Sequence, residues 1–373
     1  MPDPHLATPS GKPRARALGV PFDGTPGRNN AITDVAGVEV GYATIIRGDG
    51  ALVVGEGPVR TGVTAILPRG RAGAATPVFA GCFSLNGNGE LTGAIWIEEA
   101  GRCEGPITIT NTHSCGLARD ATIRWLVENL PQFVDAWGLP VAGETYDGYL
   151  NDINGFHVRE AHVFEAIDGA RGGAIEEGSV GGGTGMTAYE FKAGSGTASR
   201  LVEHDGGTYT VGAFVQANFG MREELTIAGV PVGRHLTEGT FRSRGAGSII
   251  AVVASDAPLL PHQLKRLARR IALGVGRSGS ISHHGSGDIF LAFSTANAAA
   301  CDAAAGVAAA DFIPDLRLDP IFAAVAQATD EAIVNALVAN QTMTGRDGHT
   351  VLALPHDELR AVLKSYNRLA ESA

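Results

Sequence analysis

The stretch RGAGSIIAVVASDAP, residues 244–258, decides how this chain is interpreted. Three residues with almost no side chain, Gly245, Ala246 and Gly247, precede Ser248. The six residues that follow are apolar and rich in β-branched types, and polar residues and a proline close the run. This pattern predicts a strand that is buried on both faces. The Ser248 hydroxyl therefore lies at the start of a buried strand, directly after a segment with almost no side chains.

Two interpretations of Ser248 follow from this position. A lone serine at a strand edge is usually structural, and this one has neither the G-x-S-x-G pattern nor a visible His-based triad. The small residues before Ser248 favour a catalytic role. Glycine has no side chain to hinder attack by the serine hydroxyl on the preceding carbonyl, and it can adopt the strained φ/ψ angles that such attack needs. This reaction is an N→O acyl shift. After hydrolysis Ser248 would carry an α-amine with a pKa of about 8, which can act as the base for its own hydroxyl.

Composition narrows the class of protein. A chain of 373 residues can hold two domains or one large α/β unit. The apolar content of 44% provides for a deep core, and 51 glycines indicate many tight turns or close backbone approaches. A net charge of −10 argues against a nucleic-acid-binding surface.

The sequence also predicts where the protein resides. Residues 1–24 contain prolines and charges where a signal peptide needs an apolar run, and no window approaches 18 consecutive apolar residues. Four cysteines without a C-x-x-C pair suit a reduced protein better than a disulfide or zinc framework. We therefore expect a soluble cytoplasmic protein without a membrane span.

Strand and helix patterns alternate along the chain after an irregular N-terminal arm. Strands are predicted at 31–46, 62–70, 76–89, 107–116, 157–164, 208–219, 248–254 and 288–295. Helices are predicted at 117–130, 260–276, 319–340 and 357–370. Because no low-complexity linker or internal repeat interrupts this order, we expect one α/β domain, residues 1–373, whose helices cover the sheet faces.

Four motifs have ordinary structural interpretations. GVGRSG (274–279) spells a dinucleotide fingerprint, but a helix precedes it where a strand is required, so it is predicted to be a helix end and a turn. GSVGGGTGM (178–186) lacks the Lys-Ser/Thr ending of a phosphate loop and is predicted to be a flexible or substrate-facing loop. His283 and His284 point to opposite sides in extended chain and have no further ligand at suitable spacing, so no metal is expected. Cys115 is predicted to be a small buried residue that opens a helix.

Ser286 and Asp288 form a different kind of motif, in HHGSGDIFLAFS (283–294). Two residues apart, their side chains share a face in extended chain, just where a buried strand begins. A hydroxyl and a carboxylate in this position can relay a proton or hold another group in place. A capping pair in a turn is the equally weighted alternative.

The sequence resembles the family of self-processing serine peptidases that contains the L-aminopeptidase D-Ala-esterase/amidase and the β-peptidyl aminopeptidases. The segments that carry the resemblance occur in family order and span nearly the whole chain: NNAITDVAGVEVG, GETYDGYLNDINGFHV, VGGGTGM, GAFVQANFG, GAGSIIAVVASDAPLLPHQL and HHGSGDIFLAF. The resemblance implies a precursor that cuts itself between Gly247 and Ser248, giving chains 1–247 and 248–373. It also implies a four-layer αββα sandwich similar to the N-terminal-nucleophile hydrolases, with different strand connectivity.

The resemblance implies roles for six positions: Ser248 as nucleophile, Ser286 and Asp288 as its supporting pair, Asn218 and Tyr146 as oxyanion stabilisers, and Glu144 as the carboxylate that receives the substrate's free amine. Glu144 and Tyr146 point the same way if their segment is extended. The implied substrates are short peptides, amides and esters with a free amine, of L-residues, D-alanine or β-residues. No cofactor or metal is implied, and the expected assembly is a homotetramer of two-chain protomers.

Two alternatives remain beside this aminopeptidase. An acyltransferase similar to the ornithine acetyltransferases shares the self-cleaving architecture but uses threonine, so Ser248 argues against it. A non-catalytic small-molecule binding protein would have a decayed site, and the complete set of six residues argues against decay.

Overall fold

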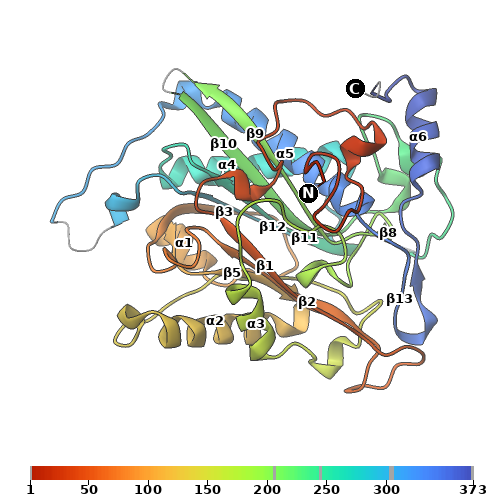
Figure 1. The fold of residues 1–373 in the computed structure, drawn as a ribbon, viewed down its shortest axis with the longest axis horizontal. Helices are drawn as coiled ribbons and strands as arrows, with labels where there is room; N and C mark the ends of the chain where they lie inside the picture. Colours follow the sequence, from red (N-terminus) through yellow and green to blue (C-terminus); the bar gives the residue numbers. More distant parts are fainter. Residues whose placement is uncertain (1, 205–206, 243–245, 302–305, 371–373) are drawn as a thin grey trace.

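Two β-sheets pack face to face, and helices cover their outer faces (Figure 1). The computed structural model describes residues 2–204, 207–242, 246–301 and 306–370. The layers run from helices α2 and α3 through a four-stranded and a six-stranded sheet to helices α4 and α5. This arrangement confirms the predicted αββα sandwich.

The strands fall into two large sheets and two small pairs. The four-stranded sheet has the order β1 (Glu39–Arg47), β2 (Val59–Leu67), β5 (Ile107–Asn111), β6 (Ala142–Thr145). The six-stranded sheet has the order β4 (Arg102–Cys103), β3 (Val78–Gly87), β12 (Gly285–Ser294), β11 (Ala246–Ser255), β10 (Gly207–Asn218), β9 (Ser195–His204). The pairs are β7 (Thr187–Ala188) with β8 (Phe191–Lys192), and β13 (Met343–Thr344) with β14 (Thr350–Val351).

Two helices cover each large sheet. The four-stranded sheet is covered by α2 (Cys115–Asn129) and α3 (Glu160–Asp168), and the six-stranded sheet by α4 (Pro261–Arg277) and α5 (Asp319–Val338). Two further helices are α1 (Ala94–Ala100), beside β3 and β4, and α6 (His356–Ser365) near the end of the chain. By length and composition, α5 is the one helix among the described residues that could cross a membrane, but 83% of its most apolar window is buried inside the protein, as in a core helix.

Strand β11 is buried on both faces, as its sequence predicted. Ile249 and Val253 pack in the cluster that the sheet forms with α4 and α5, whereas Ile250 and Val252 pack against the four-stranded sheet. Because side chains alternate along a strand, Ser248 belongs to the face between the two sheets.

The partners of β11 determine what surrounds Ser248. Strand β10 runs antiparallel to it and pairs Asn218 with Ser248. Strand β12 runs parallel on the other side and pairs Gly247 with Ser286, and Ser248 with Gly287. Both β11 and β12 are interior strands, with β10 and β3 as their outer neighbours.

The strand predicted at 157–164 is wrong, because α3 begins at Glu160. Ala161 and Val163, with a polar residue between them, gave the segment a short alternation. In the fold, Val163 and Ile167 are four residues apart and both pack beneath β1 and β2, which is helical spacing. The alternation was too short to outweigh this packing.

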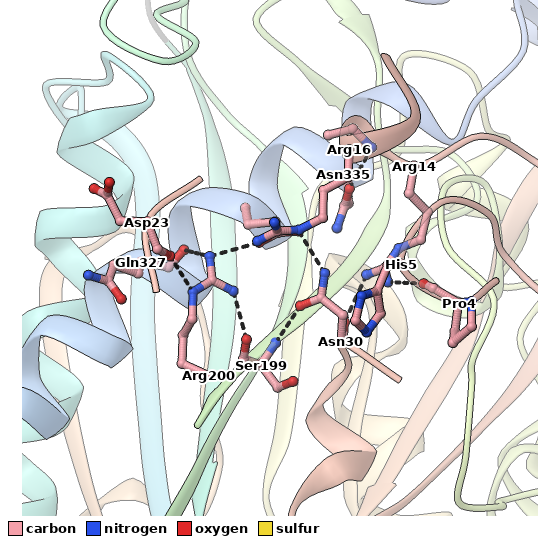
Figure 2. A network of polar contacts seen from close by, with 12 residues as sticks. Pro4, His5, Arg14, Arg16, Asp23, Asn30, Ser199, Arg200, Gln327 and Asn335 are labelled. Atoms are coloured by element: carbon pink, nitrogen blue, oxygen red, sulfur yellow. Dashed lines mark hydrogen bonds and ion pairs between the residues drawn. The ribbon is translucent and has the colours of Figure 1, made fainter. Parts of the chain in front are cut away.

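Buried charges fix the N-terminal arm to the rest of the fold (Figure 2). Arg14 Nε lies 2.6 Å from Glu177 Oε2, and both side chains are almost fully buried. Arg16 from the arm and Arg200 from β9 both bind Glu331 of α5 at 2.7 Å. Burial opposes ionisation of Glu331, but the two guanidinium groups outweigh it and hold its pKa below the usual value.

Candidate active site

One cavity of about 770 Å³ brings together residues from both large sheets. Five of the predicted site and cleavage residues line it: Glu144, Tyr146, Asn218, Gly247 and Ser248. Its volume lies in the range of small-molecule sites. The cavity lies where β6 of one sheet and the paired ends of β10 and β11 of the other come together.

Asn218 is held in a fixed orientation beside Ser248. Its Nδ2 donates to the backbone oxygen of Tyr146 at 2.9 Å, and its Oδ1 accepts from the backbone nitrogen of Thr187 at 2.9 Å. Since an amide NH₂ has two donors, and only one is used among the residues that the structure describes, one N–H remains for another acceptor. The contact to Tyr146 also ties the end of β10 to the segment that follows β6.

Glu144 is the buried carboxylate of the cavity. Its side chain is 3% exposed, its Oε1 accepts from the backbone nitrogen of Glu90 at 3.0 Å, and its Oε2 accepts from the Thr112 hydroxyl. Burial raises the pKa of Glu144, and the two donors oppose this rise because they stabilise the ionised form. Glu144 and Tyr146 line the same cavity, as their spacing predicted, and the Tyr146 ring is about half exposed.

Ser286 and Asp288 lie behind the cavity wall. Ser286 Oγ donates to Asp288 Oδ1 at 2.6 Å, so the two side chains share a face as predicted. The Ser282 hydroxyl donates to Oδ2, and the backbone of Ile249 also binds the Asp288 carboxyl, whose pKa is raised by burial. Asp288 stands two residues before Phe290, which packs on the α4–α5 side of the sheet. The pair therefore contacts the backbone of β11 and does not line the cavity with Ser248.

Gly247 occupies a position that only glycine fits. Its φ is +129°, and a Cβ atom there would lie 2.0 Å from the backbone oxygen of Asn218. Side chains rarely adopt this φ, and the neighbouring backbone of β10 leaves no space for one. The unusual backbone angle that the sequence predicted for glycine here is thus present, on the residue that precedes the nucleophile candidate.

The remaining motifs have structural roles. Helix α4 ends at Arg277 and Gly279 follows with a positive φ, which confirms a helix end and a turn at 274–279. Cys115 begins α2, and burial raises its pKa to about 12, so it remains a thiol. His283 binds Glu224 at 2.6 Å, and the part of the chain that the structure describes contains no group of three or more metal-binding side chains.

The glycine-rich segment 178–186 is packed rather than flexible. Most of it is buried, and a Cβ at Gly182 would lie 2.2 Å from Gln216 Oε1 and 2.5 Å from the backbone oxygen of Ile109. The glycines serve close packing between the sheets, not mobility. Only Gly185 of this segment lines the cavity, which supports the substrate-facing part of the prediction.

Several cavity residues gave no signal in the sequence. They are Thr112, Tyr149, Thr187, Phe241 and Arg242. Thr187 follows the glycine-rich segment, and Thr112 lies inside the strand predicted at 107–116, but neither pattern indicates a site. Contacts between distant segments put them in the cavity.

Asp147, directly after Tyr146, is a buried carboxyl whose ionisation costs stability. It is fully buried, and Asn151 Nδ2 donates to its Oδ1 at 3.0 Å, whereas its Oδ2 has no hydrogen-bond partner among the described residues. Burial raises its pKa from 3.8 to about 7. A raised carboxyl pKa means that the folded state binds the proton more tightly, so stability falls as pH rises from about 4 to 7, by up to about 4 kcal/mol.

Asp147→Asn should therefore remove part of the pH dependence of stability. The variant mimics the protonated carboxyl, so it should gain stability over the original chain at pH 8 and little at pH 5. Thermal unfolding at both pH values checks this. Parallel changes in Tm for the two proteins would contradict a buried titrating Asp147.

Comparison with known proteins identifies the family. The model of peptidase family S58 matches residues 30–351. The chain belongs to peptidase family S58. A β-peptidyl aminopeptidase of Sphingosinicella microcystinivorans is 56% identical to this S58 chain, over 96% of this chain and 93% of that protein.

Solved structures agree with the family. The L-aminopeptidase D-Ala-esterase/amidase of Ochrobactrum anthropi, described as a prototype for the serine aminopeptidases and as a variant of the Ntn hydrolase fold, has a TM-score of 0.91 and 50% identity and covers 96% of this chain and 100% of its own. A β-aminopeptidase of a Burkholderia species has a TM-score of 0.86 and 45% identity and covers 96% and 100%. These matches confirm the predicted fold and the prediction of a serine aminopeptidase.

Proposed function

We propose that this S58 peptidase cleaves its own chain between Gly247 and Ser248, and then releases N-terminal residues from short peptides, amides and esters through an acyl-enzyme on Ser248. One observation carries the proposal: Ser248 shares a single cavity with an oriented amide, Asn218, and a buried carboxylate, Glu144. Ser286 and Asp288 support the nucleophile from behind.

The maturation step begins with attack of Ser248 Oγ on the Gly247 carbonyl carbon. The new C–O bond forms as the C–N bond breaks, and the amide nitrogen becomes the free amine of Ser248. Water then hydrolyses the ester and leaves a carboxylate on Gly247. The strand register supports this step, because Gly247 pairs with Ser286, so the new amine arises beside the Ser286–Asp288 pair.

Peptide cleavage uses the same nucleophile. The Ser248 amine takes the proton of the Ser248 hydroxyl, and Oγ attacks the substrate carbonyl. The free N–H of Asn218 and the Tyr146 phenol stabilise the oxyanion, and loss of one such donor costs about 10²–10³ in rate. The proton then passes to the leaving amine, and water hydrolyses the acyl-enzyme.

Glu144 gives the site its preference for a free amine. A buried carboxylate attracts an ammonium group strongly, and it offers nothing to an acylated nitrogen. If the site binds only the amine of the first residue, it selects weakly for the chirality and backbone length of that residue. This agrees with relatives named for β-peptidyl substrates and for both L-residues and D-alanine.

Membership of family S58 favours hydrolysis over the acyltransferase alternative. The expected cytoplasmic homotetramer stays a prediction.

An assay of amino-acid amides with and without a chelator tests this function. We expect release of the first residue from L-alanine amide and D-alanine amide, unchanged after extensive incubation with EDTA, because none of the proposed steps uses a metal. No hydrolysis of either amide, or of a β-alanine amide, would overturn the proposal. A loss with EDTA that zinc or manganese restores would show that a metal takes part.

A further inference from the structure

The cavity contains a cation as well as a carboxylate. Arg242 lines it together with Glu144, and its partly buried side chain lies against the paired strand β7. Arg242 Nη1 donates to the backbone oxygen of Gly220 at 2.8 Å, and Nη2 donates to the Thr187 backbone oxygen at 2.9 Å and its Oγ1 at 2.6 Å. Among the described residues these contacts use three of the five N–H donors of the guanidinium, so Nε–H and one N–H of Nη1 remain for a ligand.

No carboxylate forms an ion pair with Arg242 among the described residues. The nearby buried carboxylate, Glu190, instead accepts the backbone N–H groups of Phe241 at 2.6 Å and Arg242 at 2.5 Å with Oε1, and that of Arg222 with Oε2. Glu190 thus fixes the backbone of this segment, whereas the guanidinium binds Thr187, which also lines the cavity. Burial lowers the pKa of Arg242 to about 10, so it is charged at neutral pH.

A chain of hydrogen bonds orders the polar groups of the cavity. Asn218 Nδ2 binds the backbone of Tyr146, two residues from Glu144. On its other side, Asn218 Oδ1 contacts Thr187, whose Oγ1 accepts from Arg242. The oxyanion donor Asn218 therefore stands between the carboxylate and the guanidinium.

We propose that Arg242 binds the C-terminal carboxylate of a dipeptide, so that the cavity prefers substrates with a free amine and a free carboxylate on either side of one scissile bond. This inference rests on the proposed aminopeptidase function. The amine lies on Glu144, the scissile carbonyl lies between Ser248 and Asn218, and the leaving residue's carboxylate accepts one of the remaining N–H groups of Arg242.

The wall beside Arg242 suits an aromatic or other large side chain on the leaving residue. Tyr149 and Phe241 both line the cavity, and their rings stack at 4.3 Å between centroids. The His349 ring also stacks on Tyr149, with 4.5 Å between centroids. The rings offer apolar contact area at small cost in conformational freedom.

Matched substrates test the proposal in the unmodified protein. We expect kcat/KM for L-Ala-L-Phe to exceed that for L-Ala-L-Phe amide by about 10- to 100-fold, the contribution of charge-assisted hydrogen bonds. The tripeptide L-Ala-L-Phe-L-Ala should also be a poor substrate, since its C-terminal carboxylate lies about 3.3 Å further along the chain than that of the dipeptide. Equal rates for acid and amide would overturn the role of Arg242. Failure to cleave any free-amine substrate would instead contradict the aminopeptidase function itself.

Variants assign the preference to a residue. Arg242→Gln should bring the acid-to-amide ratio close to one, and Arg242→Lys should keep part of it. Arg234→Gln is the matched control, because this exposed arginine lines a neighbouring cavity without lining that of Ser248. An unchanged ratio in Arg242→Gln would overturn the proposal. Intact mass shows whether each variant is processed; if Arg242→Gln is not, the substrate series decides alone.

Discussion

Purified protein is expected to contain two chains, of 247 and 126 residues, and Ser248→Ala is expected to remain one chain of 373 residues without activity. The alanine variant has no hydroxyl to attack Gly247, and therefore never forms the N-terminal amine that serves as its base. Loss of a catalytic nucleophile costs orders of magnitude, and here we expect at least about 10⁴-fold in rate. Denaturing mass spectrometry and the amide assay measure the two effects.

Ser248→Cys controls for folding in this experiment. A thiol retains a nucleophile at the same place, so this variant should still be cut between residues 247 and 248. Comparable thermal unfolding of the Ser248→Ala chain shows that its inactivity is not misfolding. An active protein with the mass of one uncut chain would exclude the proposed maturation.

Glu144→Gln is expected to be processed normally but to cleave poorly. Self-cleavage has no substrate amine to hold, whereas substrate binding loses a buried charge pair worth about 2–5 kcal/mol. Because the carboxylate also aligns the reacting carbonyl, kcat and KM should both suffer. Acetylation of the substrate amine should abolish cleavage by the original protein for the same reason. Kinetics with free and acetylated alanine amide provide the measurement.

The pH profile adds an independent readout for Glu144. Burial raises its pKa, so the carboxylate becomes neutral, and the attraction for the ammonium is lost, as pH falls through this raised value. Glu144→Gln should lack this acidic limb. Glu90→Gln is the control, since Glu90 is an exposed carboxylate in the same cavity whose backbone donates to Glu144. It should keep the acidic limb, moved to lower pH, because the Glu90 charge adds to the rise in the pKa of Glu144. If Glu144→Gln is cut and hydrolyses at the original rate, the amine is held elsewhere.

The sequence predicted what depends on local pattern. The apolar run after Ser248 became a strand buried on both faces, and the bare Gly247 became a close backbone approach. The layer order of the sandwich came from the resemblance, because no periodicity tells which sheet face meets which helix. The roles of the six predicted site residues stay predictions, although five of the predicted site and cleavage residues line one cavity.

What the sequence could not show depends on contacts between distant segments. Arg242 reaches the cavity because Glu190, 52 positions earlier, accepts its backbone N–H. The pairing of β12 with β11 determines on which side of the sheet Ser286 and Asp288 lie. The sequence around these two residues does not show which side this is. Helix α3 also depends on distant contacts. Its short alternation predicted a strand, but packing beneath β1 and β2 favours a helix.

The position of β11 and β12 inside their sheet determines the fate of a cut molecule. After the proposed cleavage, β12 and all of β11 from Ser248 onward belong to the second chain, whereas β3 and β10 on either side of them belong to the first. To dissociate, the two chains would have to break two complete strand ladders and expose the cores on both sides of the sheet. If the chain is cut as proposed, the protomer is an obligate heterodimer in which separation and unfolding are one event. We infer that dilution alone does not release either chain.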